Sequence, residues 1–409
     1  MSSIQAMISR ENNSADQKYR LTLYASYTDY VVQGIVNNVN PILFIYYQRM
    51  LGLPLGKISS LIAINFAVQI VIDLLSSKYI DRIGIRKCML ISNTVSALGL
   101  IGITVFPFLF GNVYIALVIA TVLNAIGGGL IEVLISPIVE AIPGKNKDKR
   151  MSMLHSFYSW GCFVFIIIST LLLKLFGASR WYLVPMIWAL IPVIDGMIFI
   201  KAPINMVAND KKKGSVSALF KNRIFWAMCL LMVCAGAGEM AMSQWASYFS
   251  EVGLHVDKTL GDLLGPGMFA VLMGLSRVLY GKTGSKVKLE TTMKRSAVLC
   301  FGSYLLAVFA PHPLIGLFGC AICGFACGIF WPGTYSLSAK LFSTGEAAFF
   351  AILAFFGDIG CFSGPQLVSL FSQIIPKAGL KAGLCAAAIF PLGSFILLHF
   401  STKKTGNRV

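Results

Sequence analysis

Apolar stretches of about 20 residues, separated by short polar breaks, recur along the chain from Leu21 to Phe400. A helix needs this length to cross the hydrocarbon core of a bilayer, so each stretch predicts one membrane-spanning helix. The pattern predicts an all-α integral membrane protein with twelve spans, at residues 20–46, 58–80, 87–110, 113–141, 150–176, 179–201, 222–250, 260–281, 292–311, 313–340, 346–373 and 379–400.

The longest polar break, residues 202–221, leaves six predicted spans on either side. It predicts a linker between two six-helix bundles, at residues 20–201 and 222–400, with tails at 1–19 and 401–409. The first tail is polar and lacks a cleavage site of small residues, so no signal peptide is expected. The composition agrees, because 56% of the residues are hydrophobic and only 12% are charged, which is more apolar surface than a soluble protein would bury.

The basic residues are unevenly shared between the two predicted sides of the membrane. The tails and alternate loops on one side carry 26 of the 34 Lys and Arg residues, and the loops on the other side carry seven. This bias predicts a protein of the cell membrane with both termini in the cytoplasm. A nucleic-acid-binding protein would gather its excess charge, here +17, on one folded domain, whereas these residues are scattered over short loops.

The two predicted halves share a short internal repeat. Gly129–Glu132 matches Gly328–Trp331, and Ser156–Cys162 resembles Phe355–Cys361, both at an offset of 199 residues. Two six-helix halves in the same orientation are a transporter architecture, in which a solute binds near the bilayer midplane and is exposed to each side in turn. The sequence shows no nucleotide-binding glycine loop, nucleophile elbow or metal-ligand pair that would predict an enzyme.

The polar break after the second predicted span carries a family motif. It reads Ser77-Lys-Tyr-Ile-Asp-Arg-Ile-Gly-Ile-Arg-Lys87 and resembles the cytoplasmic signature of the major facilitator superfamily, with Ser77 in place of the usual leading Gly. Residues 238–245 and 273–277 are similar to the fucose:proton symporter branch of that family. The resemblance implies the twelve-helix transporter fold. It also implies a gating role, latching helices on the cytoplasmic side, for Asp81, Arg82 and Arg86.

Polar side chains form a stripe on the first and on the fourth predicted span. Asp29, Gln33 and Asn37 follow one another at intervals of four residues on the first, and Asn124 and Glu132 share a face of the fourth. An ionisable group inside a bilayer is costly and is therefore a candidate for function. A carboxyl group that loses contact with water favours its neutral form, so it can hold a proton during occlusion and release it when water returns.

The symporter branch carries its coupling proton on acids of the first and fourth helices, which implies this role for Glu132 and for Asp29. Asn37 or Asn38 is an alternative occupant of the first-helix position. A fixed hydrogen bond between two helices is the alternative interpretation for Glu132. His155 is a third candidate, as a proton relay, against the ordinary interpretation of a structural histidine.

Further polar and aromatic residues deep in the predicted spans are candidates for contact with a solute. Helix packing is the alternative for Glu239, and interface anchoring is the alternative for Trp331 and Tyr335. Arg277 is predicted to pair at a gate or to extend to the interface rather than to bind solute. The predicted solute-binding residues are Gln33, Asn37, Asn38, Asn124, Tyr158, Trp160, Glu239, Gln244, Trp245, Trp331, Tyr335 and Asp358.

Cys320, Cys323 and Cys327 have a helical spacing that could serve a metal, but the adjacent glycines favour close helix packing, and no metal or cofactor is predicted. The sequence predicts a monomeric proton-coupled symporter of a small polar solute, a sugar or sugar-like compound, surrounded by the lipid bilayer. Sodium is the alternative coupling ion. Proton-driven efflux of amphipathic compounds is the alternative function, and a receptor or scaffold would not need acids inside the membrane.

Overall fold

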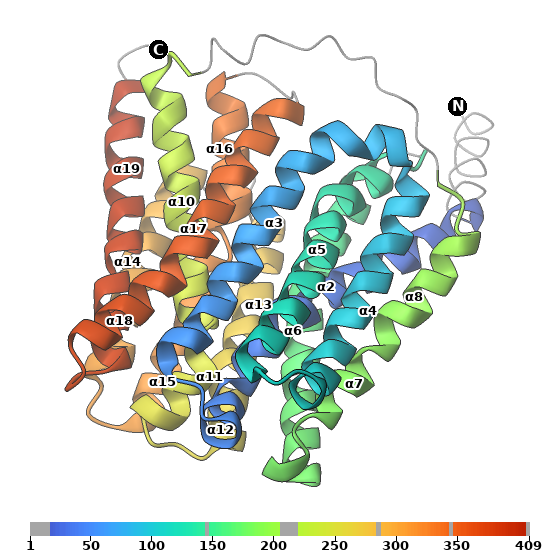
Figure 1. Cartoon of the computed structure of the whole chain (residues 1–409). Helices are drawn as coiled ribbons and strands as arrows, with labels where there is room; N and C mark the ends of the chain where they lie inside the picture. Colours follow the sequence, from blue (N-terminus) through green and yellow to red (C-terminus); the bar gives the residue numbers. More distant parts are fainter. Residues whose placement is uncertain (1–16, 144–146, 205–219, 284–287, 343–346, 406–409) are drawn as a thin grey trace. The chain divides into compact units, whose positions relative to one another are not determined.

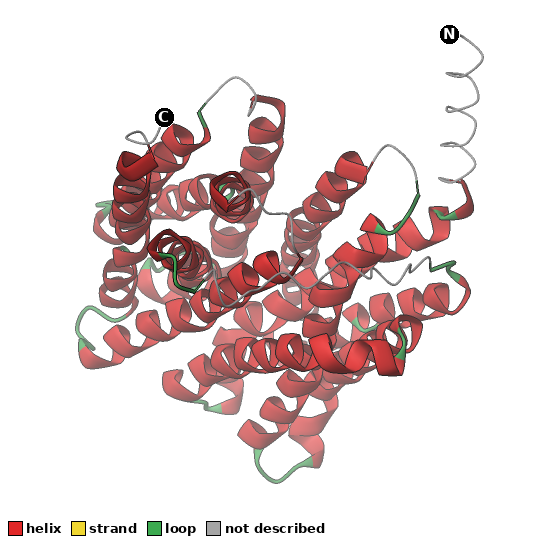
Figure 2. Cartoon of the chain, turned by 90° about the horizontal axis from the view of Figure 1, so that it is seen from above, coloured by secondary structure: helices red, strands yellow, loops and turns green. Residues whose placement is uncertain are grey.

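The structure is a computed structural model that describes residues 17–143, 147–204, 220–283, 288–342 and 347–405. Every regular element within these ranges is helical (Figures 1 and 2), which confirms the predicted all-α class. Helices cover all twelve predicted spans, and ten of them are long and apolar enough to cross a membrane. The other two are α2 (Arg20–Leu51), which carries the polar stripe of the first span, and α14 (Leu289–Phe309), which has three charged residues in its first two turns.

The first six predicted spans are formed by helices that begin and end within a few residues of the predicted limits. The sixth span is divided at Ala189, because Pro192 has no backbone N–H to donate to the carbonyl of Trp188 four residues earlier. After α2, these elements are α3 (Leu55–Ile83), α4 (Ile85–Leu109), α5 (Val113–Glu140), α6 (Lys147–Phe176), η1 (Ala178–Arg180), α7 (Leu183–Trp188) and α8 (Leu190–Lys201).

The later spans are more often interrupted. The seventh and eighth contain the π-helical turns η2 (Phe249–Gly253) and η3 (Leu263–Gly267). The tenth breaks at Gly328, whose carbonyl loses its helical donor because Pro332 follows four residues later. With α14, the remaining elements are α10 (Arg223–Ser243), α11 (Ala246–Tyr248), α12 (Lys258–Asp262), α13 (Met268–Thr283), α15 (Pro313–Cys327), α16 (Phe330–Phe342), α17 (Ala347–Ile374), α18 (Leu380–Ala387) and α19 (Ile389–Thr405).

The helix ends follow from local sequence. Asn112 begins α5 by accepting hydrogen bonds from the backbone N–H groups of Tyr114 and Ile115 at 3.0 and 3.2 Å. Between α3 and α4 the chain reverses over Gly84, whose φ of 89° lies in the left-handed region that favours glycine. The sequence therefore specifies where these helices begin and how closely they follow one another.

Packing groups the described residues into two compact units. Unit 1 comprises those within Met1–Val39, Val68–Phe165 and Arg180–Asp210, and unit 2 comprises the others. The division crosses α2 two residues before Pro41, which interrupts the helical hydrogen bonding there. In unit 1, α4 packs against α5 and α8; in unit 2, α10 packs against α17 and α19, and α14 packs against α15. The proposed division into bundles at 20–201 and 222–400 stays a prediction.

Small residues allow close approach between helices of unit 2. A Cβ atom at Gly319 would lie 2.6 Å from the backbone nitrogen of Ala307, and one at Gly324 would overlap the carbonyl of Phe269. The expected close packing beside the cysteines of α15 is therefore present.

Candidate functional site

The polar face of α5 meets α2 in unit 1. Gln33 Nε2 donates a hydrogen bond to Glu132 Oε2 at 2.9 Å, and one turn further along, Tyr30 Oη and Ser136 Oγ lie 3.1 Å apart. Glu132 is partly exposed, while Gln33 is buried. The amide oxygen of Gln33 receives no hydrogen bond from any described residue. The structure thus brings together two residues that the sequence placed on separate stripes.

The two asparagines that compete for the first-helix position face different neighbours. Asn37 Oδ1 accepts a hydrogen bond from Gln69 Nε2 on α3 at 2.9 Å. Asn38 Nδ2 lies 2.8 Å from the carbonyl oxygen of Gly34 on its own helix and 3.3 Å from Cys162 Sγ on α6. Asn37 therefore continues the polar contacts of α2 toward α3, whereas Asn38 faces α6.

Asp29 lies beside a second acid, Asp195, which is not among the residues predicted for the site. Asn93 Nδ2 on α4 is 3.0 Å from Asp29 Oδ1 and 3.4 Å from Asp195 Oδ2 on α8. Both acids are fully buried, and one amide nitrogen of Asn93 faces an oxygen of each. Among the described residues, neither Asp29 Oδ2 nor Asp195 Oδ1 receives a donor. Helical periodicity could mark Asp195 as buried but could not show that it faces Asp29.

The remaining candidates of unit 1 lie around this polar face or outside it. His155 and Tyr158 of α6 both contact the ring of Tyr30, with ring centroids 5.4 and 6.4 Å away. Asn124 is buried against α4 at Gly99, where a Cβ atom would overlap its side chain. Trp160 is 43% exposed. His155 and Tyr158 thus adjoin the α2–α5 contact, whereas Asn124 and Trp160 point elsewhere.

In unit 2, Glu239 forms the centre of a second polar group. It is 3% exposed, and its Oε2 lies 3.9 Å from Arg277 Nη2, which is an ion-pair distance but too long for a hydrogen bond. Arg277 Nε lies 3.4 Å from the carbonyl oxygen of Gly328, the group that Pro332 leaves without a helical donor. The predicted pairing role of Arg277 therefore has a partner in Glu239.

An aromatic face lies close to Asp358 along α17. The rings of Trp331 and Tyr335 on α16 are tilted to each other with centroids 6.4 Å apart, and both are partly exposed. A Cβ atom at Gly357 would overlap the Trp331 ring, so this glycine lets the indole lie against the backbone of α17. Asp358, the next residue, is 5% exposed. The group offers a partly exposed aromatic surface packed against α17, one residue before Asp358 in the sequence.

Two predicted solute-binding residues at the end of α10 are engaged in packing. Trp245 is fully buried, its indole N–H donates to the carbonyl oxygen of Pro365 at 3.1 Å, and its ring contacts Phe44 at a centroid distance of 5.6 Å. Gln244 is 3% exposed. These contacts join the turn between α10 and α11 to α2 and α17 inside unit 2 and leave no exposed surface on Trp245.

The predicted gating motif lies at the α3–α4 turn. Arg86 donates hydrogen bonds of 2.7 and 2.8 Å to the carbonyl oxygens of Phe199 and Ala202, at the carboxyl end of α8. A cation in this position satisfies helix-end carbonyls and complements the helix dipole. Arg82 is exposed, and the side chain of Asp81 lies outside the described residues. Arg86 therefore ties two helices together.

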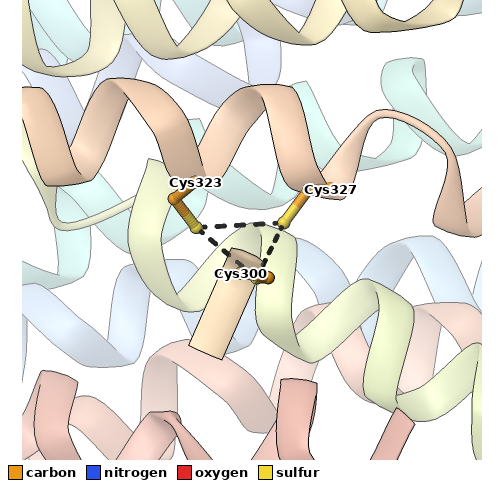
Figure 3. Close-up of side chains that lie close together, drawn as sticks. All are labelled: Cys300, Cys323 and Cys327. Carbon is orange, nitrogen blue, oxygen red and sulfur yellow. Dashed lines mark hydrogen bonds between the residues drawn. The ribbon is translucent and has the colours of Figure 1, made fainter. Parts of the chain in front are cut away.

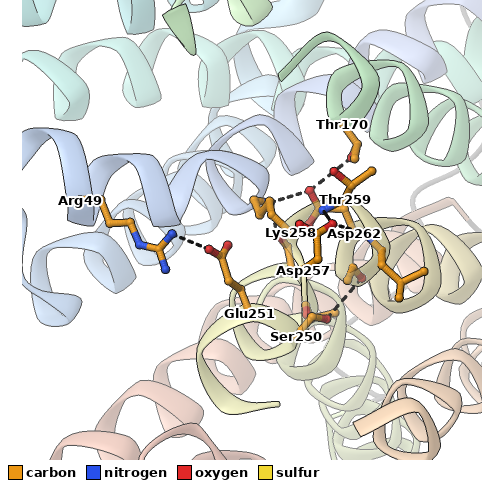
Figure 4. Close-up of polar contacts among 12 residues, drawn as sticks. Arg49, Thr170, Ser250, Glu251, Asp257, Lys258, Thr259 and Asp262 are labelled. Carbon is orange, nitrogen blue, oxygen red and sulfur yellow. Dashed lines mark hydrogen bonds and ion pairs between the residues drawn. The ribbon is translucent and has the colours of Figure 1, made fainter. Parts of the chain in front are cut away.

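Sequence reasoning missed a fully paired charge cluster in unit 2, shown in Figure 4. Asp262 accepts hydrogen bonds from Ser247 at 2.6 Å, from Lys258 at 2.5 Å and from Thr170 at 3.2 Å. Lys258 and Asp262 are four residues apart on α12, and this i, i+4 spacing was the signal available in the sequence. Nearby, Arg49 and Glu251 form an ion pair of 2.6 Å.

Comparisons with known proteins identify the kind of molecule that this geometry belongs to. The family model of the Major Facilitator Superfamily matches residues 30–365. The fucose:proton symporter FucP of E. coli is 16% identical, with 94% of this chain and 99% of that chain covered and a TM-score of 0.66. No curated protein matches the sequence.

Two other solved structures share the fold. The xylose transporter XylE of E. coli is 13% identical over 95% of this chain and 98% of its own, with a TM-score of 0.77. The nucleoside transporter NupG is 14% identical over 94% and 99%, with a TM-score of 0.72. At such identities the likeness concerns the fold alone.

Proposed function

Because the chain belongs to the major facilitator superfamily and is a multi-pass membrane transporter, we propose that it moves a small polar solute, a sugar or sugar-like compound, together with protons by alternating access. In this proposal the solute binds near mid-membrane, and protonation of buried acids accompanies the change of access.

The hydrogen bond between Gln33 and Glu132 is the observation that carries the proposal. It joins a partly exposed carboxyl group to a buried amide whose oxygen has no donor among the described residues. A carboxyl group that water can reach exchanges protons, and an amide oxygen in need of a donor suits a hydroxyl group of a solute. One pair of residues therefore offers both parts of a coupled site.

The Asp29–Asp195 pair supports a role for protons. Two carboxylates that share one amide group repel each other, and Asn93 can neutralise neither of them. The pair is therefore expected to hold a proton between its members. A proton held in this way sits one turn of α2 away from Gln33, close to the proposed coupling site.

The aromatic face of Trp331 and Tyr335 supports a sugar or sugar-like solute. Sugars present one apolar face and a rim of hydroxyl groups, and the apolar face suits a partly exposed ring surface such as that of Trp331 and Tyr335. Two of the structures that share the fold are described as a fucose:proton symporter and a D-xylose-proton symporter, which is consistent with this class of solute.

Transport by the purified protein in liposomes tests the proposal. We expect an inward proton gradient to drive accumulation of one class among monosaccharides, nucleosides and small organic acids. Glu132→Gln should abolish this accumulation but keep solute exchange between equal concentrations, because a neutral amide still binds and only the proton step is lost. Glu140→Gln, which removes the same charge from the exposed end of α5, is the matched control and should behave as wild type.

Three outcomes would contradict the proposal. Proton-driven accumulation that survives Glu132→Gln would remove this residue from the coupling step. Accumulation driven by a sodium gradient alone would identify Na⁺, rather than H⁺, as the coupling ion. Transport of several unrelated amphipathic cations, without any sugar, would favour an exporter.

A further inference from the structure

Three cysteine thiols meet where α14 packs against α15 in unit 2 (Figure 3). Cys323 and Cys327 lie one turn apart on α15, and Cys300 reaches them from α14. All three side chains are fully buried. This cysteine trio differs from the sequence-based set, because Cys300 joins it and Cys320 lies outside it.

The three sulfur atoms form a nearly equilateral triangle. The Sγ–Sγ distance is 3.8 Å for Cys300–Cys323, 3.6 Å for Cys300–Cys327 and 3.9 Å for Cys323–Cys327. A disulfide would bring two sulfurs to about 2.0 Å, so these are separate thiols. The centre of such a triangle lies about 2.2 Å from each sulfur, close to the metal–thiolate distance of about 2.3 Å. An ion slightly above the plane would reach all three sulfurs without a change in the backbone.

We infer that the cysteine trio is a binding site for one soft metal ion, Cu(I). An all-sulfur ligand set selects soft ions over hard cations such as Mg²⁺ and Ca²⁺. Structural zinc is held by four ligands and iron–sulfur clusters by four cysteines. Among the residues that the structure describes, this group of ligands has three members. Three sulfur ligands match the coordination number of a three-coordinate ion such as Cu(I).

Loading the site exchanges thiol protons for the ion. A metal binds the thiolate and releases its proton. Coordination by all three sulfurs releases three protons, and Cu(I) offsets one of the three thiolate charges, so the affinity for Cu(I) should fall as the pH is lowered. The inference does not depend on whether the protein transports a sugar.

Neighbouring groups hold the trio in position. Tyr304 Oη donates to the carbonyl oxygen of Gly238 at 2.7 Å, and Cys327 Sγ donates to the same oxygen at 3.7 Å. These contacts connect α14 and α15 to α10, one residue before Glu239. Outer contacts of this kind orient metal ligands before the ion arrives. In addition, α15 ends at Cys327, and interrupted helices often line the ligand sites of transporters.

Anaerobic titration of the full-length purified protein with Cu(I), against the chromophoric chelator bicinchoninate, tests the inference. We expect one Cu(I) per chain. Cys300→Ser and Cys327→Ser should each lower the affinity for Cu(I) at least tenfold, because only two of the three sulfur ligands remain. Cys320→Ser is the matched control, since this residue lies on the same helix and is equally buried; it should bind Cu(I) as wild type does.

X-ray absorption of the copper-loaded wild-type protein gives a second readout that does not require any variant to fold. We expect a first shell of sulfur only, with three atoms at about 2.3 Å. Nitrogen or oxygen in that shell would overturn the inference. So would an equal loss of affinity in Cys320→Ser and Cys300→Ser, or a disulfide between Cys300 and either partner in the untreated protein.

Discussion

Two buried acidic sites of the protein are built in contrasting ways. In unit 2, both oxygens of Asp262 accept hydrogen bonds, and one of the donors is the ammonium group of Lys258. In unit 1, Asp29 and Asp195 depend on the single amide of Asn93, and one oxygen of each receives no donor among the described residues. In the first site the charges of Lys258 and Asp262 cancel, whereas the second site brings two acidic side chains together.

In the proposed mechanism, this contrast separates a structural use of buried charge from a functional one. A buried charge whose partners are complete keeps its charge, and removing one partner leaves the other uncompensated. Two carboxyl groups that share too few donors cannot both ionise, so a proton is stored there and can leave when the surroundings change. The number of donors around an acid, rather than its burial, therefore indicates which sites are suited to carry a coupled proton.

Removing the charge of Asp262 should have the largest effect on stability. Asp262→Asn leaves the ammonium group of Lys258 without its counter-charge, and breaking a buried ion pair costs about 3–5 kcal/mol in the free energy of unfolding. Thermal unfolding in detergent measures this as a lower Tm. Asp257→Asn is the control, because Asn caps the start of α12 as well as Asp does and should change little.

A double variant distinguishes charge from shape at this site. Replacing both partners, in Lys258→Met with Asp262→Leu, should recover part of the lost stability, because neither charge is then left alone, whereas Ser247 and Thr170 still lose their acceptor. An unchanged Tm in Asp262→Asn, or no recovery in the double variant, would show that the pairing does not stabilise the fold.

A methyl group at Gly357 should have the next largest effect. The added Cβ overlaps the Trp331 ring, and forcing extra atoms into a packed contact costs about 1–3 kcal/mol. Gly302→Ala on α14 is the matched control, since nothing lies within 4 Å of its Cβ, and it should be neutral or slightly stabilising. Equal Tm values for the two variants would mean that the Trp331 ring can move away from α17 at no cost in stability. The packing against Gly357 would then not fix the position of the aromatic face.

Substitution within the acidic pair should cost less. Asp195→Asn removes a like charge and keeps the shape, so we expect a change below about 1 kcal/mol. Infrared spectroscopy should show a protonated carboxyl C=O band in the wild type that is lost in the double variant Asp29→Asn with Asp195→Asn. A loss of stability as large as that of Asp262→Asn would contradict the distinction between the two sites.

The fold was largely predictable, because lipid requires long apolar stretches and these are visible in the sequence. The predicted span 150–176 corresponds to α6 at Lys147–Phe176, and similar small differences apply elsewhere. The breaks in the sixth and tenth spans were not predicted, although Pro192 and Pro332 were in view. A proline near the start of a helical segment is tolerated, so its presence alone does not fix whether the preceding helix ends.

The site was less predictable, because a helical period shows which residues share a face but not which helix that face meets. Asn124 and Glu132 lie on one stripe of α5, yet Asn124 packs against α4 and Glu132 bonds to α2. Cys300 and Cys323 are likewise brought together by the packing of α14 on α15 rather than by spacing. The assignment of individual residues to proton coupling and solute binding stays a prediction.

The ion pair of Arg49 and Glu251 should have the smallest effect, and it shows whether exposure decides the strength of a pair. Its distance, 2.6 Å, is similar to that of Lys258 and Asp262, but the Arg49 side chain is 62% exposed, whereas that of Lys258 is 15% exposed. Water and salt screen an exposed pair, which is worth less than about 1 kcal/mol. Arg49→Gln should therefore lower Tm slightly at low salt and not at all in high salt. A loss comparable to that of Asp262→Asn, unaffected by salt, would mean that distance rather than exposure sets the contribution of both pairs.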